Sequence, residues 1–358
     1  MELQSALPIM SSLPSERSTG PLQAAAIADI TKHYYEIRDF SFQDGTTLAS
    51  VRLAYLDLNP NETKTALIIT CFRGRLQSTL TFASGALQNH RIIVVALFGN
   101  GESSSSSNTP GFPSSIDYRD CVRAQRELLT AYFKLESVDI IMGFSMGGQC
   151  TYYWTLMYPD YVQNAIIICS SARTSLHNYQ FLEGPKAALQ NSADYVNKDL
   201  AGTSSKPTRG LHAFGKAYSA WLTSAEWFEK QMFKALGYET LRDWDANVTE
   251  VGYSGWDPDD LLAKLHMWQK GDVTVVDASS GGSLEQTLSL IKARVLLMPC
   301  KTDQYFRWEV SERESRSIPS AIVKVIPSIW GHIAGAGANP VDTNWMDQTI
   351  TEFLAKAP

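Results

Sequence analysis

The sequence predicts an α/β fold, in which a mostly parallel central sheet has helices on both faces and a helical lid is inserted between two strands. Short continuous apolar runs indicate strands buried on both faces, since a strand with one face in water alternates polar and apolar residues. Segment 118–133, between two of these runs, has apolar residues at helical spacing, as a crossover between parallel strands requires. The apolar runs are 66–70, 92–98, 138–142 and 165–169.

The chain before these runs contains two further predicted parts. Residues 1–30 are rich in Ser, Pro and Ala without periodicity, which predicts a loosely ordered N-terminal arm. Segments 34–40 and 48–55 alternate polar and apolar residues around Asp44-Gly45, which predicts a hairpin.

After the fourth apolar run the pattern becomes helical, and this change defines the lid. The expected lid helices include 210–238 and 258–270. Strand runs resume at 295–298 and 321–326, and a last helix is expected at about 342–354. We therefore divide the chain into an arm, a core and a lid: 1–30 for the arm, 31–172 and 283–358 for the core, and 173–282 for the lid.

Composition excludes several classes of protein. The net charge of −6 is spread along the 358 residues without a basic block, so neither nucleic acid nor a membrane surface is expected as a partner. The first ten residues lack the basic and apolar parts of a secretory signal, and no window is apolar enough to span a membrane. The five cysteines form no C-x-x-C pair, which favours buried thiols in a reducing compartment. We expect a cytoplasmic protein without a metal.

The stretch Gly143-Phe144-Ser145-Met146-Gly147 places a serine between glycines directly after the 138–142 run. A serine on a sharp strand-to-helix turn has a strained backbone, and flanking glycines let the following helix pass closely. A chain with 23 glycines produces this pattern by chance at times. Its position between a predicted strand and a predicted helix is therefore what makes Ser145 the candidate nucleophile.

A serine hydroxyl needs a base to take its proton and a buried carboxylate to orient that base. In α/β-hydrolase folds the acid and then the histidine follow the serine, each on a loop after a strand. Of the four histidines after Ser145, only His332 lies between the last predicted strand and the last predicted helix. Asp303 follows the strand at 295–298. Singly, each could be an ordinary loop residue, but their order and placement together predict a Ser145, Asp303 and His332 triad. The remaining histidines fall in the lid: His177, His212 and His266.

The reaction of such a serine also requires two backbone N–H groups to stabilise an oxyanion. We expect one from Met146, at the start of the helix after the nucleophile. We expect the other from Phe72, in the loop that follows the first core strand. Cys71 is interpreted as a packing residue, because no histidine is placed beside it.

Aromatic residues are frequent in the lid, which holds five of the nine tryptophans. Taken one at a time they are interpreted as ordinary helical core. Together they favour a lid that selects apolar substrate groups. Four residues next to the catalytic loops are candidates for substrate binding: Arg73, Phe144, Tyr305 and Trp330.

Several separated motifs occur in a fixed order along the chain. They are 97–105, 144–148, His177-Asn178, 181–184, Trp330-Gly331-His332, Ala334-Gly335 and Asn339-Pro340. Over about residues 40–354 the chain therefore resembles the homoserine O-acetyltransferase-like family of the α/β-hydrolase superfamily.

This resemblance implies an α/β-hydrolase fold and gives Ser145, Asp303 and His332 their triad roles. It makes the insert a lid through which relatives often form homodimers. It also interprets the serine run 103–107 as the loop after a core strand, whereas composition alone predicts a flexible segment.

The sequence departs from the family at two positions. True homoserine acetyltransferases are similar to one another in having an acidic residue after the catalytic histidine, where this chain has Ile333. They also tend to have a small residue before the nucleophile, where this chain has Phe144. We therefore do not expect a true homoserine acetyltransferase.

The leading functional prediction is a hydrolase that acts on an ester or thioester of a small, largely apolar metabolite through a Ser145 acyl-enzyme. An alternative is an acyltransferase, in which a dry site presents an alcohol or amine and acyl-CoA serves as co-substrate. A further alternative is a non-acyl reaction of specialised metabolism, such as C–C cleavage, dehydration or cyclisation, with His332 as base. A silent binding protein is disfavoured because every triad member is present. The expected partner is a small-molecule substrate, and no cofactor is expected.

Overall fold

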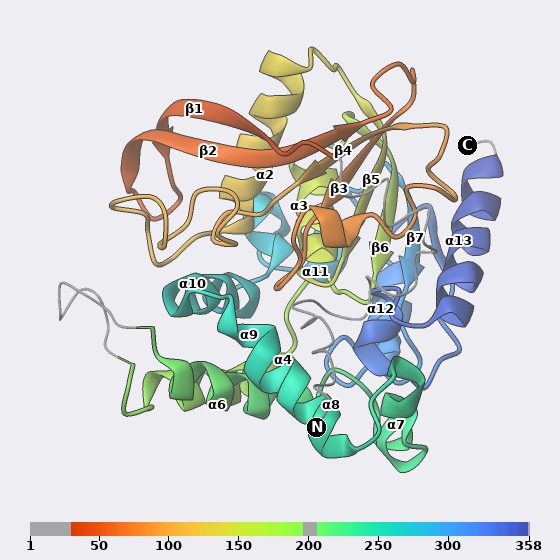
Figure 1. The fold of residues 1–358 in the computed structure, drawn as a ribbon. Coiled ribbons are helices and arrows are strands. Elements are labelled where there is room, and N and C mark those ends of the chain that lie inside the picture. Colours follow the sequence, from red (N-terminus) through yellow and green to blue (C-terminus); the bar gives the residue numbers. More distant parts are fainter. Residues whose placement is uncertain (1–29, 196–205, 357–358) are drawn as a thin grey trace.

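The computed structural model describes residues 30–195 and 206–356, and its centre is one mostly parallel sheet (Figure 1). The strands follow the spatial order β1-β2-β4-β3-β5-β6-β7-β8. Pairing is antiparallel for β1 with β2 and for β2 with β4, and parallel for all other neighbours. The strands are β1 His33–Ser41, β2 Thr47–Leu58, β3 Thr65–Ile69, β4 Arg91–Val95, β5 Val138–Phe144, β6 Val162–Ile168, β7 Arg294–Met298 and β8 Ala321–Val323. The predicted fold class is confirmed, while the arm lies outside the described residues except for Ile30.

The strands agree closely with the sequence patterns. The predicted hairpin is β1 paired with β2, and Phe40 lies opposite Leu48. All five residues of β3 are buried, which is the two-sided burial that a continuous apolar run predicts. The last predicted strand is shorter than expected, because β8 ends at Val323 and the chain returns to the sheet only as a single bridge between Ile326 and Cys300.

Helices cover the sheet on both sides. In Figure 1, α2 and α3 lie on one side of the strands and α13 lies on the other. The predicted crossover helix begins as α2, where Asp117 and Asp120 form a capping box, and it continues as the π-helical turn η3. The core helices are α2 Tyr118–Glu127, η3 Leu128–Tyr132, α3 Met146–Met157, α12 Trp308–Ser315 and α13 Pro340–Ala355.

The lid helices gather at one end of the sheet, in the lower part of Figure 1. The prediction of one helix over 210–238 is wrong. The first helix there ends at Ser219, and Ser224 begins the next, since its hydroxyl accepts a hydrogen bond from the Trp227 N–H at 3.1 Å and donates one to Ile329 O at 2.6 Å. The lid elements are α4 Leu176–Gln190, α6 Thr208–Ser219, α7 Ala225–Glu229, η4 Met232–Leu236, α8 Leu241–Asp245, η5 Ala246–Val251, α9 Gly252–Ser254, α10 Pro258–Gln269, η6 Val273–Val276 and η7 Ala278–Ser280, followed by α11 Leu284–Leu288.

The serine run is an ordered part of the core. Ser103 is fully buried, and its hydroxyl donates to Ala96 O at 2.8 Å and accepts from the Ala54 N–H at 2.9 Å. The loop therefore packs on β2, as the family resemblance implies and composition does not. Within the described residues, no helix combines the length and apolar character that crossing a membrane requires.

Candidate active site

Ser145 lies between β5 and α3 in a backbone conformation that non-glycine residues rarely adopt. Its φ is 57° and its ψ is −124°. The turn is crowded: a Cβ on Gly143 would lie 2.1 Å from Gly147 O, and a Cβ on Gly147 would lie 2.4 Å from Ile69 O. Glycine at these two positions lets α3 begin directly beside the sheet, and this is the local reason that Ser145 stands at the tip of a sharp turn.

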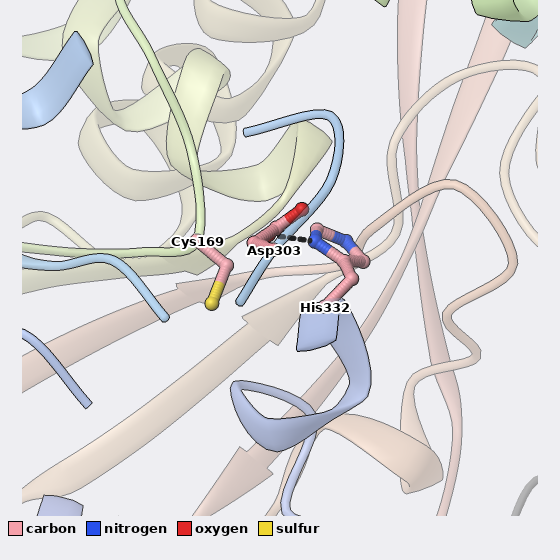
Figure 2. Close-up of side chains that lie close together, drawn as sticks. All are labelled: Cys169, Asp303 and His332. Atoms are coloured by element: carbon pink, nitrogen blue, oxygen red, sulfur yellow. Dashed lines mark hydrogen bonds and ion pairs between the residues drawn. The ribbon is translucent and has the colours of Figure 1, made fainter. Parts of the chain in front are cut away.

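Asp303 and His332 form a buried pair (Figure 2). Asp303 lies in the loop after β7, and His332 lies in the short helix η8 Gly331–Ala334 after β8. His332 Nδ1 and Asp303 Oδ2 are 2.6 Å apart, and the two residues are 4% and 5% exposed. Because an ionised carboxylate only accepts hydrogen bonds, Nδ1 carries the proton and Nε2 keeps a lone pair. This is the tautomer that a general base for serine needs.

The other oxygen of Asp303 is also engaged. Oδ1 accepts hydrogen bonds from the backbone N–H groups of Tyr305 and Phe306, each at 3.1 Å. The carboxylate is therefore held in one orientation before it binds the imidazole, and the imidazole orientation follows from it.

Aromatic rings link the imidazole of His332 to the nucleophile turn. The ring of Phe144, the residue before Ser145, lies 4.6 Å from the imidazole between ring centroids. The ring of Tyr305 lies at 4.3 Å and that of Phe306 at 5.6 Å. The structure thus brings Ser145 and the histidine–aspartate pair into one place, and it puts the substrate-binding candidates Phe144 and Tyr305 against the base.

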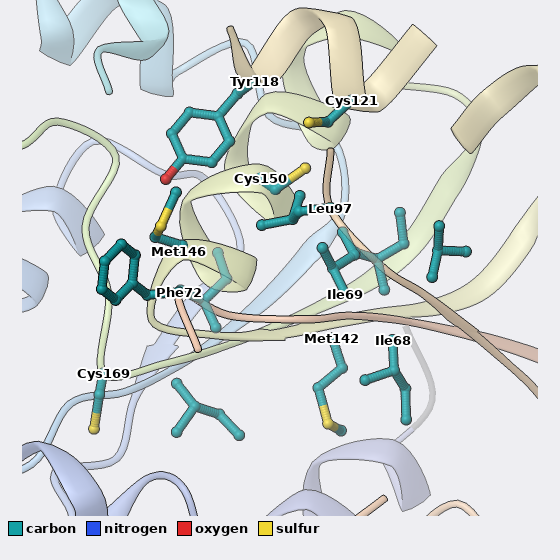
Figure 3. Close-up of a cluster of buried hydrophobic side chains, with 14 of the residues drawn as sticks. Ile68, Ile69, Phe72, Leu97, Tyr118, Cys121, Met142, Met146, Cys150 and Cys169 are labelled. Atoms are coloured by element: carbon teal, nitrogen blue, oxygen red, sulfur yellow. The ribbon is translucent and has the colours of Figure 1, made fainter. Parts of the chain in front are cut away.

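The two expected oxyanion donors also come from adjoining segments. Strands β3 and β5 are parallel neighbours, with Ile69 opposite Gly143. The loop after β3, residues 70–74, which we call the oxyanion loop, therefore begins beside the start of α3. Phe72 and Met146 both belong to the buried cluster drawn in Figure 3 and are 3% and 0% exposed. Met146 is the first residue of α3, so its N–H has no partner within the helix.

Cys71, in the oxyanion loop, agrees with its interpretation as a packing residue. Burial raises the pKa of its thiol above the ordinary value, although the nearby charge of Lys264 opposes this. A thiol that stays protonated is a poor nucleophile.

Arg73 and Trp330, the other two substrate-binding candidates, lie farther from the base. The Arg73 guanidinium lies 4.3 Å over the ring of the lid residue Tyr253. Trp330 packs on the lid residue Trp227, with ring centroids 6.0 Å apart. The structure does not bring these two side chains into contact with His332.

Sequence reasoning missed the individual lid residues that reach the site. Phe181 stacks on Tyr305 with centroids 5.1 Å apart, and Trp268 stacks on Phe306 at 5.4 Å. The aromatic enrichment of the lid indicated such a cluster without identifying its members. Lys264, which is described below, was also missed. The sequence did carry a signal for Lys264: it lies three residues after Leu261 and four before Trp268, so it is a charged residue on the apolar face of its helix.

One group of possible metal ligands occurs among the described residues, and it includes the site itself. Ligand atoms of Cys169, Asp303 and His332 lie within 4.8 Å of one another (Figure 2). Burial raises the pKa of the Cys169 thiol well above its ordinary value, with the Asp303 charge adding to the effect. Because Asp303 and His332 bind each other and the sulfur stays protonated, we assign no metal to this group.

A serine on a strained turn after a parallel strand, with a buried Asp–His pair after later strands, is the arrangement of the α/β-hydrolase class of enzymes. The chain belongs to this family: the family model described as alpha/beta hydrolase fold matches residues 69–335.

Relatives include both esterases and acyltransferases. The ethyl acetate hydrolase of Pseudomonas veronii is 35% identical over 270 residues, which are 74% of this chain and 76% of the relative. The solved structure of the acetyl esterase MekB superposes with a TM-score of 0.84 at 30% identity and covers 91% of this chain and 97% of its own. A homoserine O-acetyltransferase of Mesorhizobium japonicum is 27% identical over 243 residues, which are 64% of this chain and 61% of the relative. The resemblance to homoserine acetyltransferase-like hydrolases is thus confirmed.

Proposed function

We propose that this protein is a serine esterase that cleaves a small, largely apolar ester or thioester through an acyl-enzyme on Ser145. The observation that carries the proposal is the buried Asp303–His332 pair, at 2.6 Å, beside the strained turn of Ser145. The sequence relationship to an ethyl acetate hydrolase and the structural likeness to an acetyl esterase support the choice of reaction.

In the first half of the reaction, His332 Nε2 takes the proton of the Ser145 hydroxyl while Oγ bonds to the substrate carbonyl carbon. The carbonyl oxygen becomes an oxyanion, which the N–H groups of Phe72 and Met146 stabilise. The intermediate then collapses. The bond that breaks is the C–O bond to the alcohol in an ester, or the C–S bond to the thiol in a thioester. His332 gives its proton to that leaving group and Ser145 keeps the acyl group.

In the second half, water replaces the leaving group. His332 Nε2 takes a proton from water as the water oxygen attacks the acyl carbon. The second tetrahedral intermediate uses the same two N–H donors. It collapses to a carboxylic acid, and the proton returns from His332 to Ser145 Oγ. Asp303 stays ionised throughout and stabilises the imidazolium that forms in each half.

The walls of the site support a small substrate. Rings of Phe144 and Tyr305 contact the base, and Phe181 stacks on Tyr305 from the lid. Such walls favour short acyl and alcohol groups with few polar atoms.

An acyltransferase is the second candidate, and the homoserine O-acetyltransferase relatives favour it. In that case an alcohol or amine takes the place of water and acyl-CoA is the donor. Ile333, after the base, is 6% exposed and supplies no carboxylate that could hold the amino group of homoserine. A non-acyl reaction on the same scaffold, with His332 as base and Ser145 only as a hydrogen-bond donor, is the third.

Two variants decide among these mechanisms. In the esterase, Ser145→Ala and His332→Ala should each lower kcat on p-nitrophenyl acetate by at least roughly 10⁴-fold. A fluorophosphonate should label the wild type and not Ser145→Ala. Retention of turnover in Ser145→Ala with loss in His332→Ala would establish the non-acyl mechanism instead. Consumption of acetyl-CoA only when an alcohol or amine is present, without ester hydrolysis, would establish the transferase.

We also propose a cytoplasmic location. All five cysteines of the chain are free, and Cys71, although half-buried, keeps a thiol whose pKa is raised by burial. This pattern suits a reducing compartment. Fractionation of the native host followed by immunodetection tests the location, and recovery of the protein outside the cytoplasm would contradict it.

A further inference from the structure

Lys264 is a buried charge that the proposed mechanism does not use. It lies in the lid helix α10 and is 0% exposed, although lysine is almost never fully buried unless it is paired. No ion pair joins it to a carboxylate in the described ranges. Instead, Nζ donates hydrogen bonds to two backbone carbonyls of the oxyanion loop, those of Cys71, at 2.7 Å, and Phe72. The lid thus reaches into the core at the loop that carries the predicted Phe72 donor.

The surroundings of Lys264 explain how it stays there. Burial is the main cause that lowers the pKa of Lys264 to about 7; the charge of Arg75 acts in the same direction, and Cys71, Cys121 and Asp260 oppose the shift. The ammonium and the neutral amine both carry N–H donors, so the two contacts persist in either form.

Asp260, one turn before Lys264 in α10, fixes the helix to the core independently. Its Oδ1 accepts from the Ser107 N–H at 2.9 Å, and its Oδ2 accepts from the Ser107 hydroxyl at 2.6 Å. These two hydrogen bonds attach the N-terminal part of α10 to the ordered serine loop. The position of Lys264 is therefore set by the contacts of Asp260 with Ser107, and it does not depend only on the bonds that Lys264 makes to the oxyanion loop.

The geometry of a peptide bond gives the lysine contact its consequence. The Cys71 carbonyl and the Phe72 N–H belong to one peptide unit, and the described residues contain no cis peptide. In a trans peptide the C=O and N–H point in opposite directions. With its carbonyl bound to Lys264, this peptide must direct the Phe72 N–H away from the lysine. The second bond, to the Phe72 carbonyl, fixes the next peptide and prevents the first from rotating.

Other contacts fix the ends of the oxyanion loop and the Phe72 ring. The Thr70 N–H donates to Val95 O at 3.2 Å, and the Gly74 N–H donates to Cys71 O at 3.2 Å. The ring of Phe72 stacks on Tyr218 of the lid at 5.9 Å. The Cys71 carbonyl therefore has two donors, the Gly74 N–H from within the loop and Lys264 Nζ from the lid. Lys264 is the donor that comes from outside the loop, and it also binds the next carbonyl, that of Phe72.

We propose that Lys264 is a positioning residue that orients the Cys71–Phe72 peptide and so completes the oxyanion hole from the lid. This inference rests on the proposed acyl-enzyme function and on Phe72 as a donor. It makes the lid part of the catalytic apparatus as well as a wall of the site. It also means that withdrawal of α10 from the core would release the peptide and lower the rate.

The test compares Lys264→Met with Lys270→Met. Methionine keeps the length of the lysine stem but has no donor. Lys270 is the C-cap residue directly after the same helix, and its Nζ donates to Ser115 Oγ in an exposed contact at 3.1 Å. Turnover of p-nitrophenyl acetate is measured per active site, with the sites counted by fluorophosphonate labelling carried to completion. The affinity for an aryl trifluoromethyl ketone is measured in parallel, because its adduct with Ser145 is an oxyanion.

We expect Lys264→Met to lower kcat by roughly 10²- to 10³-fold, the effect of losing one oxyanion donor, with KM changed less than about threefold. The ketone should bind more weakly by a similar factor. Lys270→Met should match the wild type in both measurements. Lys264→Gln keeps N–H donors on an uncharged and shorter side chain, so its kcat should fall between those of the wild type and Lys264→Met. It serves as the reporter if Lys264→Met does not fold.

The outcomes separate this inference from the function on which it rests. A wild type that neither hydrolyses the ester nor reacts with fluorophosphonate overturns the proposed function. An active wild type, with unchanged kcat per labelled site and unchanged ketone affinity in the Lys264 variants, overturns the inference alone. Fewer active sites with normal turnover at each site would show that the lysine acts only on folding, and that too overturns it.

Discussion

In the core, the candidate catalytic residues Ser145, Asp303 and His332 each lie in a turn, loop or short helix that follows a parallel strand. In the lid, the side chains that reach the same site, Phe181 and Lys264, come from the middle of helices. Turns after parallel strands meet at one edge of a sheet, so chain order alone brings the core residues together. The lid residues meet the site only because helices pack in one particular way. We therefore expect core substitutions to act on the chemical step, and lid substitutions to act on fit and orientation.

The largest expected effect tests the core half of this comparison. Asp303→Asn should lower kcat on a short ester by roughly 10⁴-fold with little change in KM. An asparagine amide can donate to His332 Nδ1, which favours the tautomer with a proton on Nε2, and that nitrogen then cannot accept the serine proton. Steady-state kinetics per folded enzyme measure the effect.

Asp342→Asn is the matched control for this substitution. Asp342 is also buried, and its Oδ2 accepts from the Ser328 hydroxyl at 2.5 Å without contacting the imidazole. It should keep kcat within about tenfold. Equal losses in the two variants would mean that Asp303 has no special relation to His332, and the triad assignment would be wrong.

A smaller effect is expected where the core meets the lid. Glu314, in α12, accepts hydrogen bonds from the Ala172 N–H at 2.9 Å and from the Tyr152 hydroxyl at 2.8 Å. Ala172 is the last core residue before the lid as we divided the chain. Burial raises the pKa of Glu314 from 4.5 to about 7, against the hydrogen bonds that lower it. Glu314 is therefore protonated in the folded protein at pH values where it is ionised in the unfolded chain.

The sign of the resulting pH dependence follows from linkage. Because the folded pKa lies above the unfolded one, the stabilisation from this proton is complete below about pH 4.5 and is lost as the pH rises through 7. Glu314→Gln does not titrate. As the pH rises from 4.5 to 8, the wild type should therefore lose up to roughly 3 kcal/mol of unfolding free energy relative to Glu314→Gln.

Denaturant unfolding at several pH values measures this difference. Glu312→Gln, an exposed change in the same helix, should show no such trend. A difference between Glu314→Gln and wild type that is constant with pH would mean that Glu314 is ionised in the folded protein. In that case the contact of Glu314 with Ala172, where the core meets the lid, would be made by an ionised carboxylate.

The sequence predicted the core well because each core signal is local. An apolar run of five residues predicts a buried strand wherever its neighbours lie, and the glycines around Ser145 are needed by the turn itself. The break in the expected helix 210–238 was not predictable in this way, since it depends on a bond from Ser224 to Ile329, 105 residues later. Lys264 was missed for the same reason, because its acceptors lie 192 and 193 residues earlier.

The smallest expected effect tests the lid half of the comparison. Phe181 of α4 is 5% exposed and stacks on Tyr305 at 5.1 Å, and Tyr305 lies 4.3 Å from the His332 ring. Phe181→Ala should open space beside the base and leave the catalytic groups in place. The ratio of kcat/KM for p-nitrophenyl butyrate to that for the acetate should therefore rise about tenfold, which is in the range that one or two methylene groups produce in an apolar pocket.

Phe233→Ala separates this effect from a general loss of packing. Phe233 is a lid residue that is 6% exposed, and the centroid of its ring lies 6.2 Å from that of Trp227. Trp227 also packs on Trp330, and this group of rings does not contact the His332 imidazole. Both substitutions should cost a similar free energy of unfolding, roughly 3 kcal/mol, because each removes one buried ring. Only Phe181→Ala should change the butyrate-to-acetate ratio. If both variants change the ratio equally, the lid acts on the site through its stability as a whole, and Phe181 has no direct part in selecting the acyl group.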